Sequence, residues 1–445
     1  MAELLKSLIG LYARLHRKEF EYPLQIEENM AHVTLKELMW TGYKMLLRHP
    51  IEYGERGAHL EEYFAGQNLH FTPPEDFTAQ SSLVLSAGGD LLSSRDATPS
   101  STRHIWDEAE DFLFDADLCC GNLETPVVPS HPATFLPEKM STRLALNNSP
   151  DMFEVFHRGG HGVSVFSTAN NHSLDMGEDG LRETLEFLKT KNCVHVGTAA
   201  SEEEREDIPV VEKNGVRVAF LSYTYALNKH RLPKGREYLV NYVRLNKPEV
   251  DISMIARHIR RAREEKRADI VVACLHWSIE FESYPLRSVM ETGHRILELG
   301  VDVILGNHAH GIQPMEKYAY TDPFTGRKKD GLIAYALGDF ISCTEKDEEN
   351  TPNARISTLL RLCLAKGTID GHPAAAITDL KIRPMYFYTR MEDGACIDYR
   401  LLNLRKLLEE LQSGRDRMGL GAKAAAEAVR LGSLAKKVLH WDITA

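Results

Sequence analysis

The chain has 445 residues, a hydrophobic share of 43% and a formal net charge of −11 at pH 7. A chain of this length holds more than one folding unit, and this apolar share is that of a soluble protein with a sizeable core. The acidic balance, without any dense Lys/Arg tract, excludes the charge pattern of a nucleic-acid-binding protein.

The seven cysteines are scattered and form no Cys-x-x-Cys pair. This usage indicates small core residues in a reducing compartment, so we expect a cytoplasmic protein. No apolar stretch approaches the length of a transmembrane helix, and the first 17 residues lack the uninterrupted apolar run of a signal peptide. We therefore expect no membrane span.

Residues 1–75 are predicted to form a helical extension, because Leu, Ile, Trp and Tyr recur there at helical spacing. The first helix carries six apolar side chains at this spacing, and we expect them to pack on the protein itself and not on a membrane. Over residues 71–82 the composition shifts to Thr, Pro, Ser and Gln, which indicates a linker.

Residues 80–385 alternate short apolar runs with helix-length segments. The predicted strands are residues 82–87, 117–120, 162–167, 208–211, 216–223, 270–275, 301–305, 332–337, 356–364 and 377–382, and the predicted helices are residues 103–114, 178–190, 252–265 and 286–299. Asn214-Gly215 favours a hairpin between two of these strands, and Pro209 favours an edge position. This order predicts the α/β class with mixed sheets.

Residues 386–445 are predicted to form a C-terminal helical segment. From Tyr399 to Leu439 two apolar stripes at helical spacing follow one another, which indicates a packed pair of helices.

Five strand-like runs end in polar side chains. These are Asp90, Asn122 with Glu124, Asn170 with Asn171 and His172, His276, and His308 with His310. In open α/β sheets ligands collect beyond the carboxyl ends of the strands. Zn²⁺, Mn²⁺ and Fe²⁺ accept imidazole and carboxylate ligands together, whereas Ca²⁺ prefers oxygen alone. The pattern predicts a divalent metal site in which a carboxylate bridges two ions roughly 3.5–4 Å apart.

Each of these residues also has a purely structural interpretation. Asp90 and Glu124 could be helix caps or turn residues, and Asn171 with His172 could cap the following helix. A strand-end histidine such as His276 is often a satisfied core residue. The five polar strand ends taken together favour the metal site.

His308 and His310 add a geometric argument. Residues two apart in an extended segment point to the same side, and this spacing suits chelation.

Six blocks occur in order along the chain: Asp90, Asn122-Leu123-Glu124, Asn170-Asn171-His172 with Asp175 and Gly177, His276-Trp277 with Glu280 and Pro285, Gly306-Asn307-His308-Ala309-His310, and Tyr335-Ala336-Leu337-Gly338-Asp339-Phe340. This succession resembles the poly-γ-glutamate capsule biosynthesis (CapA-type) family, which is similar to calcineurin-like metallophosphatases. The resemblance covers residues 83–382 and implies a metallophosphatase-like four-layer α/β sandwich.

The resemblance also implies roles for individual residues. Asp90 and His310 would bind a first metal ion, and Glu124 would bridge two ions. The residues implied for a second ion are Asn171, His276 and His308. His172 would protonate a leaving group.

The chain departs from the family pattern at three points. The usual Asp-x-His reads Asp90-Leu91-Leu92, which removes one ligand of the first ion. Ser278 stands where a glycine usually follows His-Trp. Asp339 stands where Gly-Asn-Phe is usual, so Asp339 is a candidate replacement ligand or catalytic base.

The candidate substrate contacts are Asn122, Trp277, Glu280 and Arg143. For Trp277 and Glu280 the alternative is a packed loop over the site. For Arg143 it is an ordinary surface arginine.

We expect a metal-dependent hydrolase that holds two ions of Mn, Zn or Fe and acts on a phosphoester or a γ-glutamyl, peptide-like substrate, in capsule polymer metabolism. One alternative is an accessory factor for poly-γ-glutamate synthesis. Another is a peptide epimerase, in which His172, His310 and Asp339 remove and return an α-proton. The expected partner is a small-molecule or peptide-like substrate, and no feature of the sequence sets the oligomeric state.

Overall fold

The computed structural model describes residues 2–20, 34–47, 59–135, 145–341 and 352–440. Arg143, a predicted substrate contact, lies outside these residues. Among the described helices, none combines the length and the apolar character that crossing a bilayer requires.

Two mixed sheets form the centre of the molecule. Within the described residues the first has eight strands in the order β14-β13-β12-β1-β2-β3-β4, with β11 beside β1, and the second has six in the order β5-β6-β7-β8-β10-β9. The strands of the first sheet are β1 (Phe77–Leu91), β2 (Leu118–Asn122), β3 (Val165–Ser167), β4 (Val194–Val196), β11 (Asp339–Ile341), β12 (Ile356–Ile369), β13 (His372–Glu392) and β14 (Ala395–Asn403). Those of the second are β5 (Val210–Lys213), β6 (Val216–Thr224), β7 (Ile270–His276), β8 (Val303–Asn307), β9 (Met315–Thr321) and β10 (Lys328–Ala334).

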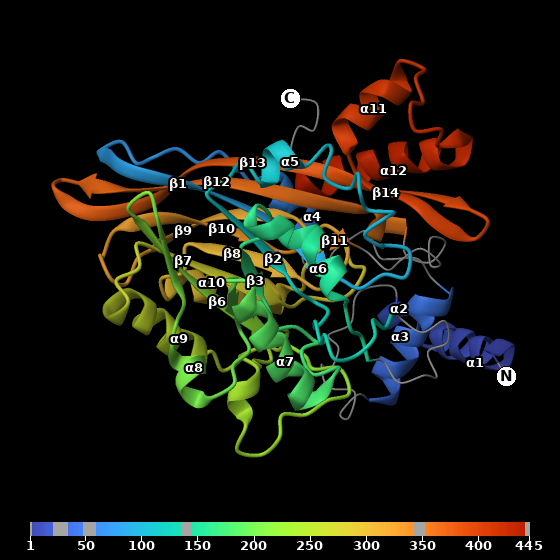
Figure 1. Cartoon of the computed structure of the whole chain (residues 1–445), viewed down its shortest axis with the longest axis horizontal. Helices are drawn as coiled ribbons and strands as arrows, with labels where there is room; N and C mark the ends of the chain where they lie inside the picture. Colours follow the sequence, from blue (N-terminus) through green and yellow to red (C-terminus); the bar gives the residue numbers. More distant parts are fainter. Residues whose placement is uncertain (1, 21–33, 48–58, 136–144, 342–351, 441–445) are drawn as a thin grey trace.

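The helices lie outside the sheets and at the two ends of the chain (Figure 1). They are α1 (Ala2–Leu15), α2 (Arg17–Phe20), α3 (Leu35–Leu47), α4 (Leu60–Ala65), α5 (Glu110–Leu113), α6 (Pro150–His157), α7 (Gly177–Thr190), α8 (Glu202–Glu206), α9 (Ser253–Arg260), α10 (Arg287–Glu298), α11 (Leu404–Gln412) and α12 (Gly421–Leu439).

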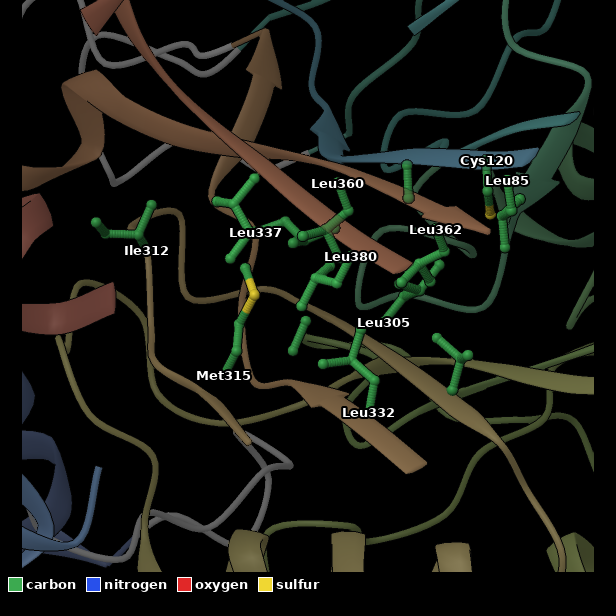
Figure 2. Close-up of a cluster of buried hydrophobic side chains, with 14 of the residues drawn as sticks. Leu85, Cys120, Leu305, Ile312, Met315, Leu332, Leu337, Leu360, Leu362 and Leu380 are labelled. Atoms are coloured by element: carbon green, nitrogen blue, oxygen red, sulfur yellow. The ribbon is translucent and has the colours of Figure 1, made fainter. Parts of the chain in front are cut away.

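The main core lies between the two sheets. Leu85 and Leu362 of the first sheet and Leu305 and Leu332 of the second belong to one buried cluster (Figure 2). Because side chains alternate between the faces of a strand, each sheet also has an outer face to cover.

Helices cover both outer faces. Ile255 of α9 and Ile296 of α10 pack outside the six-stranded sheet. Phe153 of α6 packs with Phe166 of β3 outside the other sheet. This arrangement confirms the predicted four-layer α/β sandwich.

In the described part of residues 1–75, helices α1 to α4 extend as far as Ala65. The first helix does pack on the protein, as expected, but not through the leucines of its apolar stripe. Helix α1 contacts α3, where Ile9 lies against Gly42, and Tyr12 of the stripe packs against the buried cluster that contains Ile255 and Ile296. Leu4, Leu8, Leu11 and Leu15 are each more than half exposed.

Three further predictions need correction. Residues 77–82 of the expected linker belong to β1, because this part of the strand pairs with the end of β12 (Phe77 opposite Ile369). The helix expected over residues 103–114 is reduced to α5, and the preceding residues form turns with bonds such as Ile105 N to Thr102 O. The segment 386–445 is not helical throughout, because β13 continues to Glu392 and β14 adds the edge strand. The helix pair itself is present as α11 and α12.

The hairpin at Asn214-Gly215 is confirmed. Both residues adopt positive φ (51° and 79°), as this tight turn requires. It joins β5, the edge strand that Pro209 precedes, to β6.

Candidate metal centre

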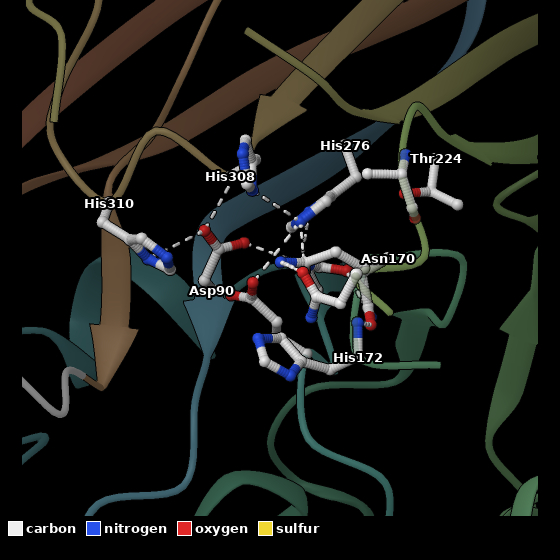
Figure 3. A network of polar contacts seen from close by, with 12 residues as sticks. Asp90, Asn170, His172, Thr224, His276, His308 and His310 are labelled. Carbon is white, nitrogen blue, oxygen red and sulfur yellow. Dashed lines mark hydrogen bonds and ion pairs between the residues drawn. The ribbon is translucent and has the colours of Figure 1, made fainter. Parts of the chain in front are cut away.

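The polar strand ends converge on one place between the two sheets (Figure 3). Asp90 comes from β1, Asn122 from β2, His276 from β7, and Asp339 from β11. Glu124 follows β2, residues 170–172 follow β3, and residues 308–310 follow β8. Strand ends of both sheets therefore supply the site.

Close backbone approach explains how Asp90 and Asp339 come together. A Cβ atom on Gly89 would lie 1.6 Å from the carbonyl oxygen of Gly338, so only glycine fits there. Asp90 donates its backbone N–H to the same carbonyl at 3.1 Å. Strands β1 and β11 then run parallel, with Asp90 opposite Asp339.

Asp90, His310 and Asp339 form the first cluster, with one candidate ligand atom from each lying within 4.8 Å of the others. His310 Nδ1 lies 2.9 Å from Asp339 Oδ1 and 3.8 Å from Asp90 Oδ2. Burial would lower the pKa of His310, but the charges of Asp339 and Glu124 outweigh it and raise that pKa well above its usual value. Burial and the charge of Glu124 raise the pKa of Asp90.

Asn171, His276, His308 and Glu124 form the second cluster. His276 Nε2 lies 2.9 Å from Asn171 Oδ1, 3.1 Å from His308 Nδ1 and 3.4 Å from Glu124 Oε1. Burial is the main reason why the pKa values of both histidines fall well below the usual range. Both rings are thus neutral, the form that coordinates a metal ion.

Glu124 connects the two clusters. One of its oxygens lies within 4.8 Å of ring nitrogens of both His308 and His310. The side chain is fully buried, and neither oxygen accepts a hydrogen bond from any described residue. Burial raises its pKa to about 7. A buried carboxylate without donors is costly, so this donor set fits a bound cation.

His172 lies beside these residues and is held by Asp175. Its Nδ1 lies 2.8 Å from Asp175 Oδ2, which also accepts the backbone N–H of Leu146 at 2.9 Å. Burial would lower the pKa of His172, but the Asp175 carboxylate outweighs it, and the pKa is raised. The ring can therefore carry a proton near neutral pH.

The backbone around the site is strained. His308 and His310 have φ of 92° and 53°, so the expected extended segment is not formed. Both rings nevertheless lie within 4.8 Å of one Glu124 oxygen, and His310 also belongs to the cluster of Asp90 and Asp339. Ser278 has φ of 71°, which explains why glycine is usual there. Asn246 stabilises Ser278 by accepting its N–H at 2.8 Å and donating to its carbonyl at 2.7 Å.

The predicted substrate contacts lie in different surroundings. Asn122 is among the ligands, where it donates to Asp90 Oδ1 at 2.7 Å. Trp277 stacks on Tyr335 and has no exposed surface with which to contact a substrate. Glu280 is partly exposed, and its charge contributes to the raised pKa of Glu124 after burial and other neighbours.

Sequence reasoning missed Tyr225 and Asn228. The Tyr225 hydroxyl lies 2.6 Å from His308 Nε2, and Asn228 Oδ1 accepts a hydrogen bond from Asn171 at 3.3 Å. Both follow β6, whose last residue pairs with His276. Their position just after the carboxyl end of β6 was the signal that could have identified them, as it did for the other five strand ends.

Residues 84–344 match the family described as bacterial capsule synthesis protein PGA_cap. The capsule biosynthesis protein CapA of Bacillus anthracis is 24% identical over 285 residues, which cover 62% of this chain and 63% of that protein. The PGA biosynthesis protein CapA of Bacillus subtilis is 27% identical over 238 residues, or 53% of this chain and 56% of that protein. A probable polyglutamine synthesis accessory protein of Mycobacterium tuberculosis is 23% identical over 251 residues, or 55% and 60%. The chain thus spans less than two thirds of the length of these relatives.

Proposed function

Because this chain belongs to the bacterial capsule synthesis protein PGA_cap family, we propose that it is a metal-dependent hydrolase of capsule polymer metabolism. Its substrate is a phosphoester or a γ-glutamyl, peptide-like bond. The observation that carries the proposal is Glu124, a fully buried carboxylate with no hydrogen-bond donor among the described residues and with neutral His276 3.4 Å away. Such a group has little structural use without a cation.

Two ligand sets divide the proposed site. Asp90, His310 and Asp339 would hold one ion, with Asp339 in place of the histidine that the Asp90-Leu91-Leu92 sequence lacks. Asn171, His276 and His308 would hold the other. Glu124, close to ring nitrogens of both His308 and His310, would be shared by the two sets. Mixed imidazole and carboxylate donors suit Mn²⁺, Zn²⁺ or Fe²⁺.

The bound ions supply Lewis acidity toward a phosphoryl or carbonyl oxygen and ease the ionisation of a water nucleophile. His172 supplies the proton. Its Nδ1 is engaged by Asp175, which leaves Nε2 to protonate the leaving group. Asn122 orients Asp90 through a 2.7 Å hydrogen bond. Glu280, partly exposed beside the cluster, is the proposed substrate contact.

A second candidate function is an accessory role in polymer assembly, favoured by the name of the mycobacterial relative. In that case the same residues hold metal ions and bind polymer without cleaving it.

Elemental analysis of the purified chain tests the metal site, and turnover of a chromogenic phosphodiester and of a γ-glutamyl anilide tests hydrolysis. We expect bound metal, loss of turnover with chelator, and recovery with Mn²⁺, Zn²⁺ or Fe²⁺. Glu124→Gln is expected to lower metal affinity and turnover strongly, whereas Asp379→Asn, on an exposed part of β13, changes neither.

Other outcomes point elsewhere. Bound metal without turnover favours the accessory role. Deuterium uptake into an otherwise unchanged peptide indicates epimerisation. Absence of both metal and turnover after reconstitution contradicts the proposal.

A further inference from the structure

Residues 278–284 form a loop directly beside the ligand residues, called here the site loop. It begins two residues after His276. Phe281 donates its backbone N–H to the carbonyl of Ala309 at 2.7 Å, between the two histidines that follow β8. The Phe281 and His310 rings lie 5.5 Å apart, centroid to centroid. The shape of this loop therefore fixes the surroundings of His310.

The site loop needs external support, because its backbone is strained. Ser278 and Phe281 both have positive φ, of 71° and 60°. Two supports come from the part of the chain that matches the family. Asn246 binds Ser278, and Gln313 donates to the carbonyl of Glu282 at 3.0 Å.

A third support comes from α3, far outside residues 84–344. Lys44 donates to the backbone carbonyl of Glu280 and forms an ion pair with the carboxylate of Glu282. The two side chains are only 7% and 1% exposed, so this pair is shielded from water. The Lys44 ammonium also lies 5.2 Å from the centroid of the Trp40 ring.

We propose that Lys44 is a positioning residue and that α3 completes the active site by holding the site loop around His310. The kinetic part of this inference rests on the proposed hydrolase function. The mechanical part does not, because it concerns only the order of the loop.

Two variants separate positioning from simple stability. Lys44→Met removes the Lys44 cation from the buried Glu282 carboxylate, and this alone destabilises the chain. The double variant Lys44→Met/Glu282→Gln removes that charge and recovers the lost stability, yet it still lacks the bond to the Glu280 carbonyl. Lys36→Met, an exposed lysine of the same helix, is the matched control.

We expect the double variant to melt close to the wild type while kcat/KM falls about 10- to 100-fold, the range found when groups that support metal-site residues are removed. Hydrogen exchange of the amides in residues 278–284 is expected to accelerate, with bound metal retained and Lys36→Met unchanged. A folded double variant with wild-type kcat/KM and wild-type exchange overturns the proposal.

If the wild type turns over no substrate, the exchange measurement decides alone. Faster exchange in the double variant then supports the positioning role, and unchanged exchange rejects it.

Discussion

A fully buried carboxylate lies near each end of strand β8, and the two carboxylates differ in their partners. Asp302 directly precedes the strand and is fully buried, but it pairs with Arg263 at 2.6 Å and with Lys329, and it accepts the N–H of Val271 at 2.7 Å. Burial raises the pKa of Asp302, but these partners outweigh it and lower that pKa. Near the other end lies Glu124, which follows β2 and is close to His308. It is equally buried without any donor among the described residues, and burial raises its pKa to about 7.

The pKa values of the two carboxyl groups shift in opposite directions because their partners differ, while their burial is the same. A buried carboxylate whose oxygens are all satisfied contributes to the fold. One whose oxygens stay open is kept for a ligand, at some cost in stability.

Asp302→Asn is expected to have the largest effect. It leaves Arg263 and Lys329, whose side chains are only 9% and 11% exposed, without their counter-charge, which costs about 3–5 kcal/mol in the free energy of unfolding. Urea denaturation measures this loss. A loss below about 1 kcal/mol would show that the partners of Asp302 contribute little to stability, and the contrast with Glu124 would fail.

The same pair gives a pH test. Because the pKa of Asp302 is lowered in the folded state, its stabilisation is fully present above the ordinary aspartate pKa of about 3.9 and disappears as pH falls through the folded value. We expect the stability difference between wild type and Asp302→Asn to be constant from pH 7 to about 5 and to shrink below about pH 4. A difference that persists undiminished to acid unfolding contradicts this assignment.

Glu124→Gln is expected to impair function and not stability, the opposite of Asp302→Asn. The metal-free variant is expected to be as stable as the wild type or more stable, because an unpaired buried charge is removed. Metal affinity and turnover should fall about 100-fold or more, since supporting groups alone contribute 10- to 100-fold. Calorimetric titration with Mn²⁺ and thermal melting in chelator measure the two effects. A strongly destabilised metal-free variant would make Glu124 a structural residue.

Lys329→Met is expected to have the smallest effect. Asp302 keeps Arg263 and loses one charged hydrogen bond, worth about 1.5 kcal/mol. Turnover should not change, because Lys329 lies at the start of β10, at the end of the sheet away from the ligands. If Lys329→Met lost as much stability as Asp302→Asn, the lysine alone would account for the stabilisation of Asp302, which contradicts this prediction.

Much of the candidate site could be predicted because its residues follow strands, and the carboxyl ends of neighbouring parallel strands lie at the same edge of a sheet. Asp90, Glu124, His276 and the residues after β8 were found in this way. Lys44 could not be found, since it contacts Glu280 across 236 positions and lies on a helix with no motif.

The fold was predicted least well where periodicity is ambiguous. Leu401 and Leu402 suit a helix as well as a strand, and pairing of β14 with β13 decides the outcome. The short β11 escaped prediction because its three residues gain their partner from β1, about 250 positions earlier.

Strand β8 is paired on both sides, by β7 and β10. Such a central strand opens only when the whole domain unfolds, whereas loops and termini open far more readily. His308, attached to its end, is therefore anchored to a strand that opens late. Release of bound metal on heating should accordingly coincide with cooperative melting of the sheets and not precede it.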